Sequence, residues 1–251
     1  MKNTISVAIP YYNSSHFILD ALHPLLNDNR ISEIIICDDK SSDIDIQLLQ
    51  NKITSLNNPK ITVYFNEENL GCFKNKLKVL SYCSNDWAIL LDADNIINTD
   101  YIDRLYLIDT WNPKYIYAPQ IAFTFPGYPS PHLDYSEYAN KVISKQVYLR
   151  DFKKNTFQCL INTCNYFVPV KEYLKNMETI SNLYNRPYMD SLDSAVLFTE
   201  WLTENEVFVV NNLFYKHRLH DESNYSMSKS KNSENIVKNY LYYKIYLCLD
   251  H

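Results

Sequence analysis

The chain has 251 residues, 46% of them hydrophobic and 21% charged, a composition typical of a folded globular domain rather than a disordered segment. Only 2 residues are glycine, which excludes the glycine-rich loops that cradle phosphates in many nucleotide-binding proteins. The net charge is -5 and no run of basic residues is long enough to follow a nucleic-acid backbone, so we expect no nucleic-acid partner.

The cysteines and the hydrophobic segments limit the cellular setting that we expect. None of the 6 cysteines forms a CxxC pair, which argues against a zinc site, and most lie in apolar stretches typical of buried thiols. The first residues lack the apolar segment of a signal peptide, and no run is long enough to span a membrane. The sequence therefore predicts a cytoplasmic protein with free thiols.

The first hundred residues alternate between two kinds of segment. Short apolar runs that predict strands lie at residues 5–10, 33–37, 60–65 and 87–91. Segments with helical spacing of apolar residues lie between them, at residues 14–26, 42–56 and 71–83. This alternation predicts an α/β fold with a mostly parallel sheet, in which ligands bind at the carboxyl ends of the strands.

The pattern is less regular after residue 95. Strands are predicted at residues 115–125, 166–168 and 207–210, and helices at residues 99–110, 190–202 and 236–249. Residues 126–135 and 216–231 are predicted to be loops, the second of them able to close over a ligand. The Tyr- and Leu-rich segment 239–249 favours a packing helix, although contact with a membrane surface is an alternative.

Acidic residues follow three of the first four predicted strands, and the most informative are in Asp92-Ala93-Asp94. These two carboxylates directly follow the apolar run WAILL and are two residues apart, so in extended backbone they point the same way. A divalent cation could be approached by both and could bridge the phosphates of a nucleoside diphosphate. An acidic turn without a function is the alternative, but an Asp pair after a buried strand is costly without a partner.

Two further segments lie at the same predicted edge. Asp38 and Asp39 end the second strand, and a carboxylate there could accept the N3–H of uracil; the alternative is a cluster that caps the following helix. The segment Asn66–Gly71 leads into the third helix, where Lys74 could reach a phosphate or a base. A turn with a solvated lysine is the alternative interpretation of that segment.

Four motifs in order, IPYYNSSHFILDAL, IIICDDKSSD, NEENLGCFKNKL and WAILLDADN, resemble the nucleotide-binding half of family-2 glycosyltransferases with the GT-A fold. The resemblance covers residues 4–105. It implies a single domain of 251 residues, with a nucleotide-sugar-binding half at residues 1–105 and an acceptor-binding half at residues 106–251.

The resemblance also implies a role for each matching position. Asp94 would bind a divalent cation, Mn²⁺ or Mg²⁺, directly, and Asp92 would lie near the metal and the ribose. The expected substrate-binding residues are Pro10, Tyr12, Asp38, Asp39, Asn69, Gly71, Lys74, Asp92 and Ala93. Lys40 stands where the family usually has glycine, and Lys74 or Lys76 would replace an arginine that is often found there.

Two segments of the second half match the family more weakly. SLDSAVLFTEWL resembles the acidic segment that supplies the general base, so Asp193 is the first candidate and Asp190 the second; Leu192 replaces the usual first acid. LFYKHRLHDESNYS resembles the Tyr…Arg-x-His…Ser segment, in which His220 matches a histidine that coordinates the metal in some members. Helix capping by the acids and a surface histidine without a function are the alternatives.

The resemblance implies an inverting transfer of a sugar from a nucleotide sugar, with UDP as the favoured nucleotide, to a hydroxyl of a glycan or lipid-linked acceptor in cell-surface polysaccharide or lipooligosaccharide synthesis. A peripheral position at the inner face of the membrane would suit such an acceptor. Two alternatives remain, a nucleotidyltransferase and a catalytically silent module that binds sugar nucleotides.

Overall fold

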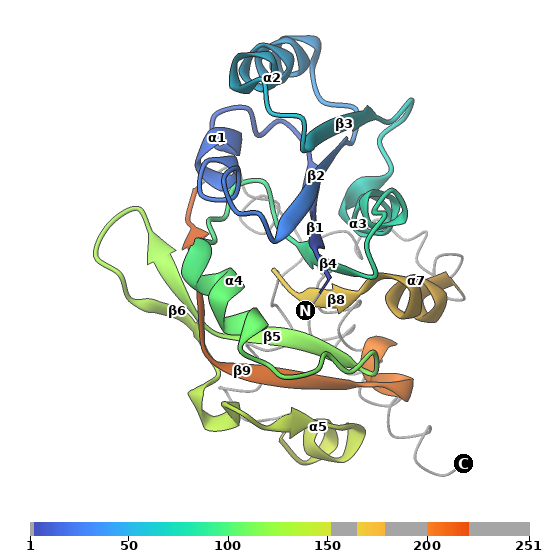
Figure 1. Ribbon diagram of the computed structural model, residues 1–251, viewed down its shortest axis with the longest axis vertical. Helices are drawn as coiled ribbons and strands as arrows, with labels where there is room; N and C mark the ends of the chain where they lie inside the picture. The colour runs from blue at the N-terminus through green and yellow to red at the C-terminus, as the bar shows by residue number, and fades with distance from the viewer. Residues whose placement is uncertain (1–2, 152–164, 179–199, 221–251) are drawn as a thin grey trace, which may run out of the picture.

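The computed structural model describes residues 3–151, 165–178 and 200–220, with the elements labelled in Figure 1. The strands are β1 (Ile5–Tyr11), β2 (Ile31–Asp38), β3 (Ile61–Phe65), β4 (Trp87–Leu90), β5 (Tyr115–Phe125), β6 (Pro131–Asp134), β7 (Val142–Ile143), β8 (Phe167–Pro169) and β9 (Glu206–Arg218). The helices are α1 (Ile18–Leu22), α2 (Asp43–Leu56), α3 (Gly71–Ser81), α4 (Thr99–Tyr106), η1 (Ser136–Tyr138), α5 (Lys145–Asp151) and α7 (Val170–Glu178).

The strands described form one sheet in the order β3-β2-β1-β4-β8-β5-β9-β7, with β6 paired to β5. β1 is parallel to both β2 and β4, and β2 is parallel to β3. β8 runs antiparallel between β4 and β5, and β5 is parallel to β9. The prediction of a mostly parallel α/β sheet is therefore confirmed, with the antiparallel pairs confined to the second half.

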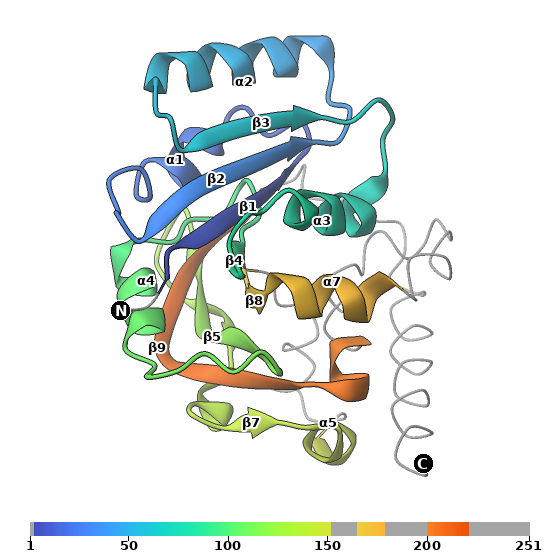
Figure 2. The same cartoon turned by 45° about the vertical axis from the view of Figure 1, so that its right-hand side comes forward.

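Helices cover both faces of the parallel strands. Figure 1 shows α1 and α3 on opposite sides of β1 and β2, with α7 beside α3, and Figure 2 shows α2 running along β3. Six of the seven residues of β1 are buried, which explains its nearly continuous apolar sequence, since a strand covered on both faces has no polar side.

The strand β1 has β2 on one side and β4 on the other, so the order in which strands are added to the sheet changes direction at β1. The pairing extends past β4 through a hydrogen bond from the Leu91 N–H to the Ala8 carbonyl, at 2.9 Å. Residues Asp92 onward therefore emerge at the carboxyl end of β1. A reversal of this kind is where open α/β sheets bind their ligands.

β9 is much longer than the predicted strand at residues 207–210, and its last three residues lie in the predicted loop at 216–231. Its pairing with β5 is offset in the middle: Val210 lies opposite Pro119, whereas Phe214 lies opposite Ile121. The bulge contains Asn212, whose φ is +60° and whose N–H donates to the side chain of Gln120 at 2.7 Å. Asn211 and Asn212 interrupt the apolar run, which is why the predicted strand ended at residue 210.

Other predicted boundaries were wrong by a few residues. The predicted helix at 14–26 forms only as α1, because turns surround it. The helix at 99–110 ends at Tyr106, and Asn98 is its N-cap. The predicted loop at 126–135 contains β6, and the sequence did not predict α5 or α7. The predicted strand at 166–168 is found as β8, shifted by one residue.

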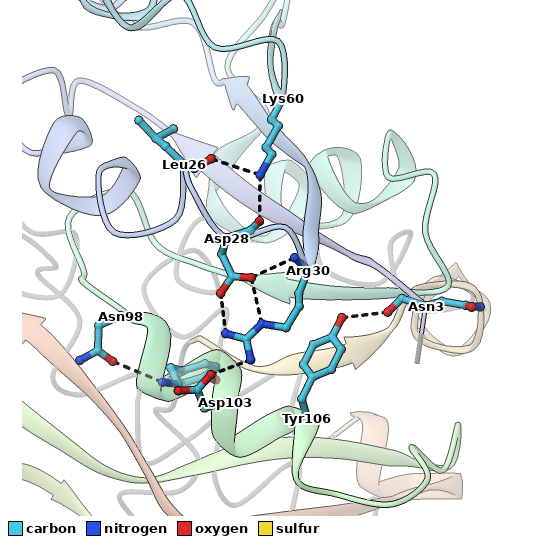
Figure 3. A network of polar contacts seen from close by, with 9 residues as sticks. Asn3, Leu26, Asp28, Arg30, Lys60, Asn98, Asp103 and Tyr106 are labelled. Atoms are coloured by element: carbon cyan, nitrogen blue, oxygen red, sulfur yellow. Dashed lines mark hydrogen bonds and ion pairs between the residues drawn. The ribbon is translucent and has the colours of Figure 1, made fainter. Parts of the chain in front are cut away.

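A polar network lies where β2 and β3 begin, and Figure 3 shows its residues. The Arg30 guanidinium lies between the carboxylates of Asp28 and Asp103, at 2.6 Å from each, and also over the Tyr106 ring at 5.2 Å from its centroid. Lys60 donates to the Asp28 carbonyl at 2.8 Å. These contacts connect β2 and the start of β3 to α4.

Some predictions lie outside the described residues, including most of the helix at 190–202, the loop after residue 220 and the helix at 236–249. Within the described part, residues 200–204 are helical. No helix in the described part combines the length and the hydrophobicity that a membrane span requires.

Candidate functional site

The end of β1 is bound to the turn that follows β2. The Asn13 N–H donates to the Ser41 hydroxyl at 2.8 Å, and the Asn13 side chain accepts from the Ser42 N–H at 3.0 Å. Asn13 has φ of +45°, which allows the chain to reverse there. Pro10 and Tyr12 therefore lie at the carboxyl edge, and the Tyr12 side chain is 47% exposed and available to a ligand.

Asp38 is fully buried at the end of β2 and supports this turn. Its carboxylate accepts from the Ser41 N–H at 3.2 Å and from the Ser41 hydroxyl. Burial raises the pKa of the Asp38 carboxyl, and the bonds from Ser41 act in the opposite direction. The structure therefore places Asp38 behind the edge of the sheet, where it can hold the turn in shape.

Asp39 binds the segment that leads into α3. Its carboxylate accepts from the Leu70 N–H at 2.8 Å, from the Gly71 N–H at 2.9 Å and from the Asn66 side chain at 3.0 Å. The Asn69 side chain donates to the Asp39 carbonyl at 2.8 Å. Because a carboxylate offers about four acceptor positions, these three bonds leave one for a ligand. Contact with a base therefore stays a prediction.

Gly71 has φ of +79°, a conformation that favours glycine, and so its backbone can turn towards Asp39 at the start of α3. Lys74 lies half-buried in the first turn of that helix. Its predicted contact with a phosphate or a base stays a prediction.

Asp45 is a buried residue that the sequence analysis missed. Its carboxylate accepts from the Tyr11 hydroxyl and from the Ser15 N–H, so it ties α2 to the segment between β1 and α1. Burial and the bond to Asp45 raise the pKa of the Tyr11 hydroxyl. The signal available in the sequence was the capping pattern Ser42-x-x-Asp45, since the Ser42 hydroxyl accepts from the Asp45 N–H at 3.3 Å.

The first carboxylate of Asp92-Ala93-Asp94 is held by protein groups. Asp92 lies 3.3 Å from the Lys76 ammonium, and the Asn95 side chain donates to it at 3.4 Å. The Asp92 N–H donates to the Asn165 side chain at 3.1 Å. The sequence analysis named Lys76 only as an alternative to Lys74. Its spacing from Phe73 and Val79, on the buried face of the helix, was a signal that the lysine points inward.

The second carboxylate meets a residue from the far end of the described chain. Asp94 Oδ2 lies 2.9 Å from His220 Nε2, and both side chains are partly exposed. The backbone of Ile96 pairs with that of Lys216 in both directions, which aligns the end of β9 with the turn after β4. Two of the three predicted metal-binding residues, 126 apart in the sequence, are thus brought together.

The donor atoms of Asp94 and His220 fit a divalent cation. Neighbouring ligands of a six-coordinate Mg²⁺ or Mn²⁺, each about 2.1 Å from the ion, lie about 3.0 Å apart, which matches the observed separation. Among the described residues, no group of three or more His, Cys, Asp and Glu side chains could hold a metal ion. The pair could supply only two ligands, so a cation here would have to take the others from phosphates and water, as Mg²⁺ often does.

The local charges leave room for a cation. Lys76 balances Asp92, and Arg218 is paired with Asp20 at 2.6 Å. Burial lowers the pKa of the His217 imidazole, while the charges of Asp94 and Asp92 oppose that shift. The Asp94 carboxylate contacts His220, and a cation bound there would compensate its charge.

Ala93 is buried between the two carboxylates, and its side chain packs into the core. Asp190 and Asp193, the predicted general bases, lie outside the described residues. The contacts of Arg218 and Asn165 at this edge were not predicted from the sequence, since each of these residues acts through a contact with a distant segment.

The sequence matches one protein family and several individual proteins. Residues 6–174 match the sequence profile of the family described as Glycosyl transferase family 2. TuaG of Bacillus subtilis (strain 168), which is named as a teichuronic acid biosynthesis glycosyltransferase, is 29% identical over 130 residues, or 51% of this chain and 47% of TuaG. Glycosyltransferase GlyG of Streptococcus pneumoniae serotype 4 is 25% identical over 107 residues, or 42% of this chain and 35% of GlyG. The chain thus matches less than half of the length of either relative.

Solved structures show the same fold at low identity. S. aureus TarS, residues 1–349, in complex with UDP-GlcNAc has a TM-score of 0.70 and 16% identity, covering 97% of this chain and 66% of that one. GalNAc-T7 with UDP, GalNAc and Mn²⁺ has a TM-score of 0.62 and 14% identity, covering 87% of this chain and 44% of that one. These likenesses confirm the expected GT-A arrangement of the sheet and its helices.

Proposed function

Because the chain belongs to glycosyl transferase family 2, we propose that it transfers a sugar from a UDP-sugar to a hydroxyl group of a glycan or lipid-linked acceptor, with inversion at the anomeric carbon. The observation that carries this proposal is the contact between Asp94 and His220 at the carboxyl edge of the sheet, beside Asp92. These residues would meet the diphosphate of the donor there.

The choice of donor rests on the structural neighbours. TarS was solved with UDP and with UDP-GlcNAc, and GalNAc-T7 was solved with UDP, GalNAc and Mn²⁺. In this chain, Tyr12 is exposed at the sheet edge where Asp39 lies, so both residues would contact the base. A UDP-sugar is therefore the proposed donor.

The proposed acceptor is a cell-surface glycan or its lipid-linked precursor. The name of TuaG, which refers to teichuronic acid biosynthesis, supports this class of acceptor. A lipid-linked acceptor would place the reaction at the inner face of the membrane, where we propose that the protein acts.

We propose that Asp94 and His220 hold a divalent cation in the complex with the donor, with Asp92 close to it. The cation, when bound, would supply positive charge that stabilises the departing diphosphate. Lys76 orients Asp92 through their ion pair, and the Asn165 side chain holds the backbone of Asp92 in place.

In the proposed reaction, the acceptor oxygen forms a bond to the anomeric carbon as the bond from that carbon to the diphosphate breaks. The hydroxyl proton passes to Asp193, or to Asp190 if Asp193 is not the base. One displacement inverts the configuration, and the electron pair of the broken bond leaves with UDP.

Two substitutions test this assignment. Asp94→Ala is expected to reduce transfer by roughly 100-fold or more, because it removes charge stabilisation of the leaving group. It should also weaken Mn²⁺-dependent binding of UDP, measured by calorimetry. Asp193→Asn is expected to reduce transfer by about 10²- to 10⁴-fold with donor binding retained, since only the base is lost.

Asp109→Asn is the matched control, because this residue is exposed on the chain after α4 and lies away from the site. Full transfer activity in Asp94→Ala would contradict the metal assignment. If Asp193→Asn stays active and Asp190→Asn does not, Asp190 is the base.

A catalytically silent sugar-nucleotide-binding module is the alternative, suggested by Lys40 and Leu192. Lys40 has φ of +64°, so it adopts the backbone conformation that the usual glycine would supply.

A thermal-shift screen of UDP-sugars with Mn²⁺ would identify the donor, since a ligand that binds only the folded state raises the melting temperature. Slow hydrolysis of that donor would then distinguish an enzyme from a silent module.

A further inference from the structure

Arg218 is the last residue of β9, and it is buried at the edge of the site. Its Nε donates to the Asp94 carbonyl at 2.9 Å, and its Nη2 donates to Asp20 at 2.6 Å. Its backbone N–H donates to the Asn95 side chain at 3.0 Å. One residue therefore connects the turn after β4 to α1.

Two aromatic rings fix the plane of the guanidinium. The Arg218 Cζ lies 4.7 Å from the centroid of the Phe17 ring and 4.8 Å from that of Phe125. The Phe17 ring also lies 4.8 Å from the ring of His220. Arg218 therefore contacts the backbone of Asp94 and the ring that packs against His220.

We propose that Arg218 is a positioning residue, which holds the Asp94 backbone and the Phe17 ring in place. The Asp94 carboxylate and the His220 imidazole then stay at a distance suited to a cation. The inference rests on the proposed function of this pair. It assigns no contact between Arg218 and the substrate.

The surroundings of Arg218 argue against a direct role as a phosphate anchor. Its side chain is only 9% exposed, and its charge is already paired with Asp20. A residue that binds the diphosphate would have to leave Asp20 and both rings. The observed contacts are directed instead to the Asp94 backbone and to the Phe17 ring that packs against His220.

The planar fork of donors explains why an arginine suits this position. Nε and Nη2 of one guanidinium reach two different acceptors while its faces contact the two rings. A lysine presents one ammonium group and cannot reproduce this arrangement. We therefore expect Arg218→Lys to retain the fold and to lose the positioning.

The test compares Arg218→Lys and Arg218→Met with Arg104→Met, a matched control in which an exposed arginine of α4 loses its charge. Hydrogen exchange of the amides at residues 94–96, measured without metal, reports the turn itself. Both Arg218 variants should exchange faster by roughly tenfold, the size of effect that loss of a hydrogen bond to a charged group produces.

Calorimetry with Mn²⁺ and UDP provides the second measurement. The Arg218 variants should bind Mn²⁺ roughly 10- to 100-fold more weakly, as expected when a residue that supports a metal ligand is lost, while Arg104→Met binds as the wild type does. Wild-type exchange and wild-type Mn²⁺ affinity in folded Arg218→Met would overturn the inference.

If Arg218→Met does not fold, Asp20→Asn decides, since the Asp20 side chain is 52% exposed and its loss leaves the core intact. Faster exchange at residues 94–96 in this variant supports the inference, and unchanged exchange overturns it. Absence of Mn²⁺ and UDP binding in the wild type would contradict the proposed function, and the exchange experiment would still decide the role of Arg218.

Discussion

At the scale of single residues, Lys40 shows how a change from the family pattern is accommodated. Its φ of +64° lies in the left-handed region, which costs a residue with a Cβ atom roughly 1–2 kcal/mol. The turn still forms, because Asp38 and Ser41 are bonded across it at 3.2 Å. The sequence departs from the pattern here, and Lys40 adopts a backbone conformation that glycine takes most readily.

We therefore expect Lys40→Gly to raise the free energy of unfolding by up to about 1 kcal/mol, because relief of strain exceeds the added entropy of the unfolded chain. Urea denaturation measures this change. Lys40→Ala is the control, since alanine keeps the Cβ atom and should give no gain. A loss of stability in Lys40→Gly would mean that the lysine side chain itself stabilises the turn.

At the scale of elements, the start of α3 depends on a residue of another strand. Leu70, at the N-cap position, makes no side-chain hydrogen bond to the helix. The Asp39 carboxylate accepts from the Leu70 and Gly71 N–H groups instead, and its negative charge lies at the positive end of the helix dipole. Asp39 thus joins β2 to α3 and also faces the predicted site of the base.

Asp39→Ala is expected to lower the free energy of unfolding by about 2–4 kcal/mol, because three donors lose a charged acceptor in a buried place. Thermal and urea denaturation measure the loss, with Asp109→Ala as the control on an exposed acid. A change below about 1 kcal/mol would show that water replaces the carboxylate without cost.

The strands of the first hundred residues could be predicted closely, because each is an apolar run that ends at a polar residue, whereas the helix predicted at 14–26 forms only as α1. The same rule failed for β9, where Asn211 and Asn212 interrupt the run and the bulge depends on Gln120. β6 was missed because the three prolines of residues 126–135 favour a loop, while pairing with β5 determines its conformation.

At the scale of the whole molecule, the network of Figure 3 makes stability depend on pH. The hydrogen bond from Arg30 holds the pKa of the Asp28 carboxyl below its usual value of 3.8, against the opposing effect of burial. A lowered pKa in the folded state contributes stability above the unfolded value, and that contribution is lost as the pH falls through the folded pKa.

We expect the free energy of unfolding to decrease as the pH drops below about 4. Its dependence on pH should be shallower in Asp28→Asn, because this variant lacks the titrating carboxyl. At pH 7 the variant should be less stable by about 1–2 kcal/mol, since a charged hydrogen bond is lost. Urea denaturation between pH 2.5 and pH 7 measures both effects, over a range chosen to span the ordinary Asp pKa of about 3.9. Equal slopes in both proteins would contradict this assignment.

The candidate site could be predicted in part. Asp39, Asp92 and Asp94 follow strands, and the rule that ligands bind at the carboxyl ends of a parallel sheet selects them without coordinates. Lys76 and Arg218 could not be placed in this way, because their partners come from segments that only tertiary structure brings near. The meeting of Asp94 with His220 depends on the register of β9, which the sequence does not show.

The bulge in β9 limits how the length of this strand can vary. Losing or gaining one residue near Asn212 would turn every later side chain of the strand to the opposite face, so Arg218 would point away from Asp20. Losing two would keep the faces but draw His220 along the sheet by roughly 7 Å, beyond the reach of Asp94. An insertion or deletion of one or two residues at this point is therefore expected to separate Arg218 or His220 from its partner at the sheet edge.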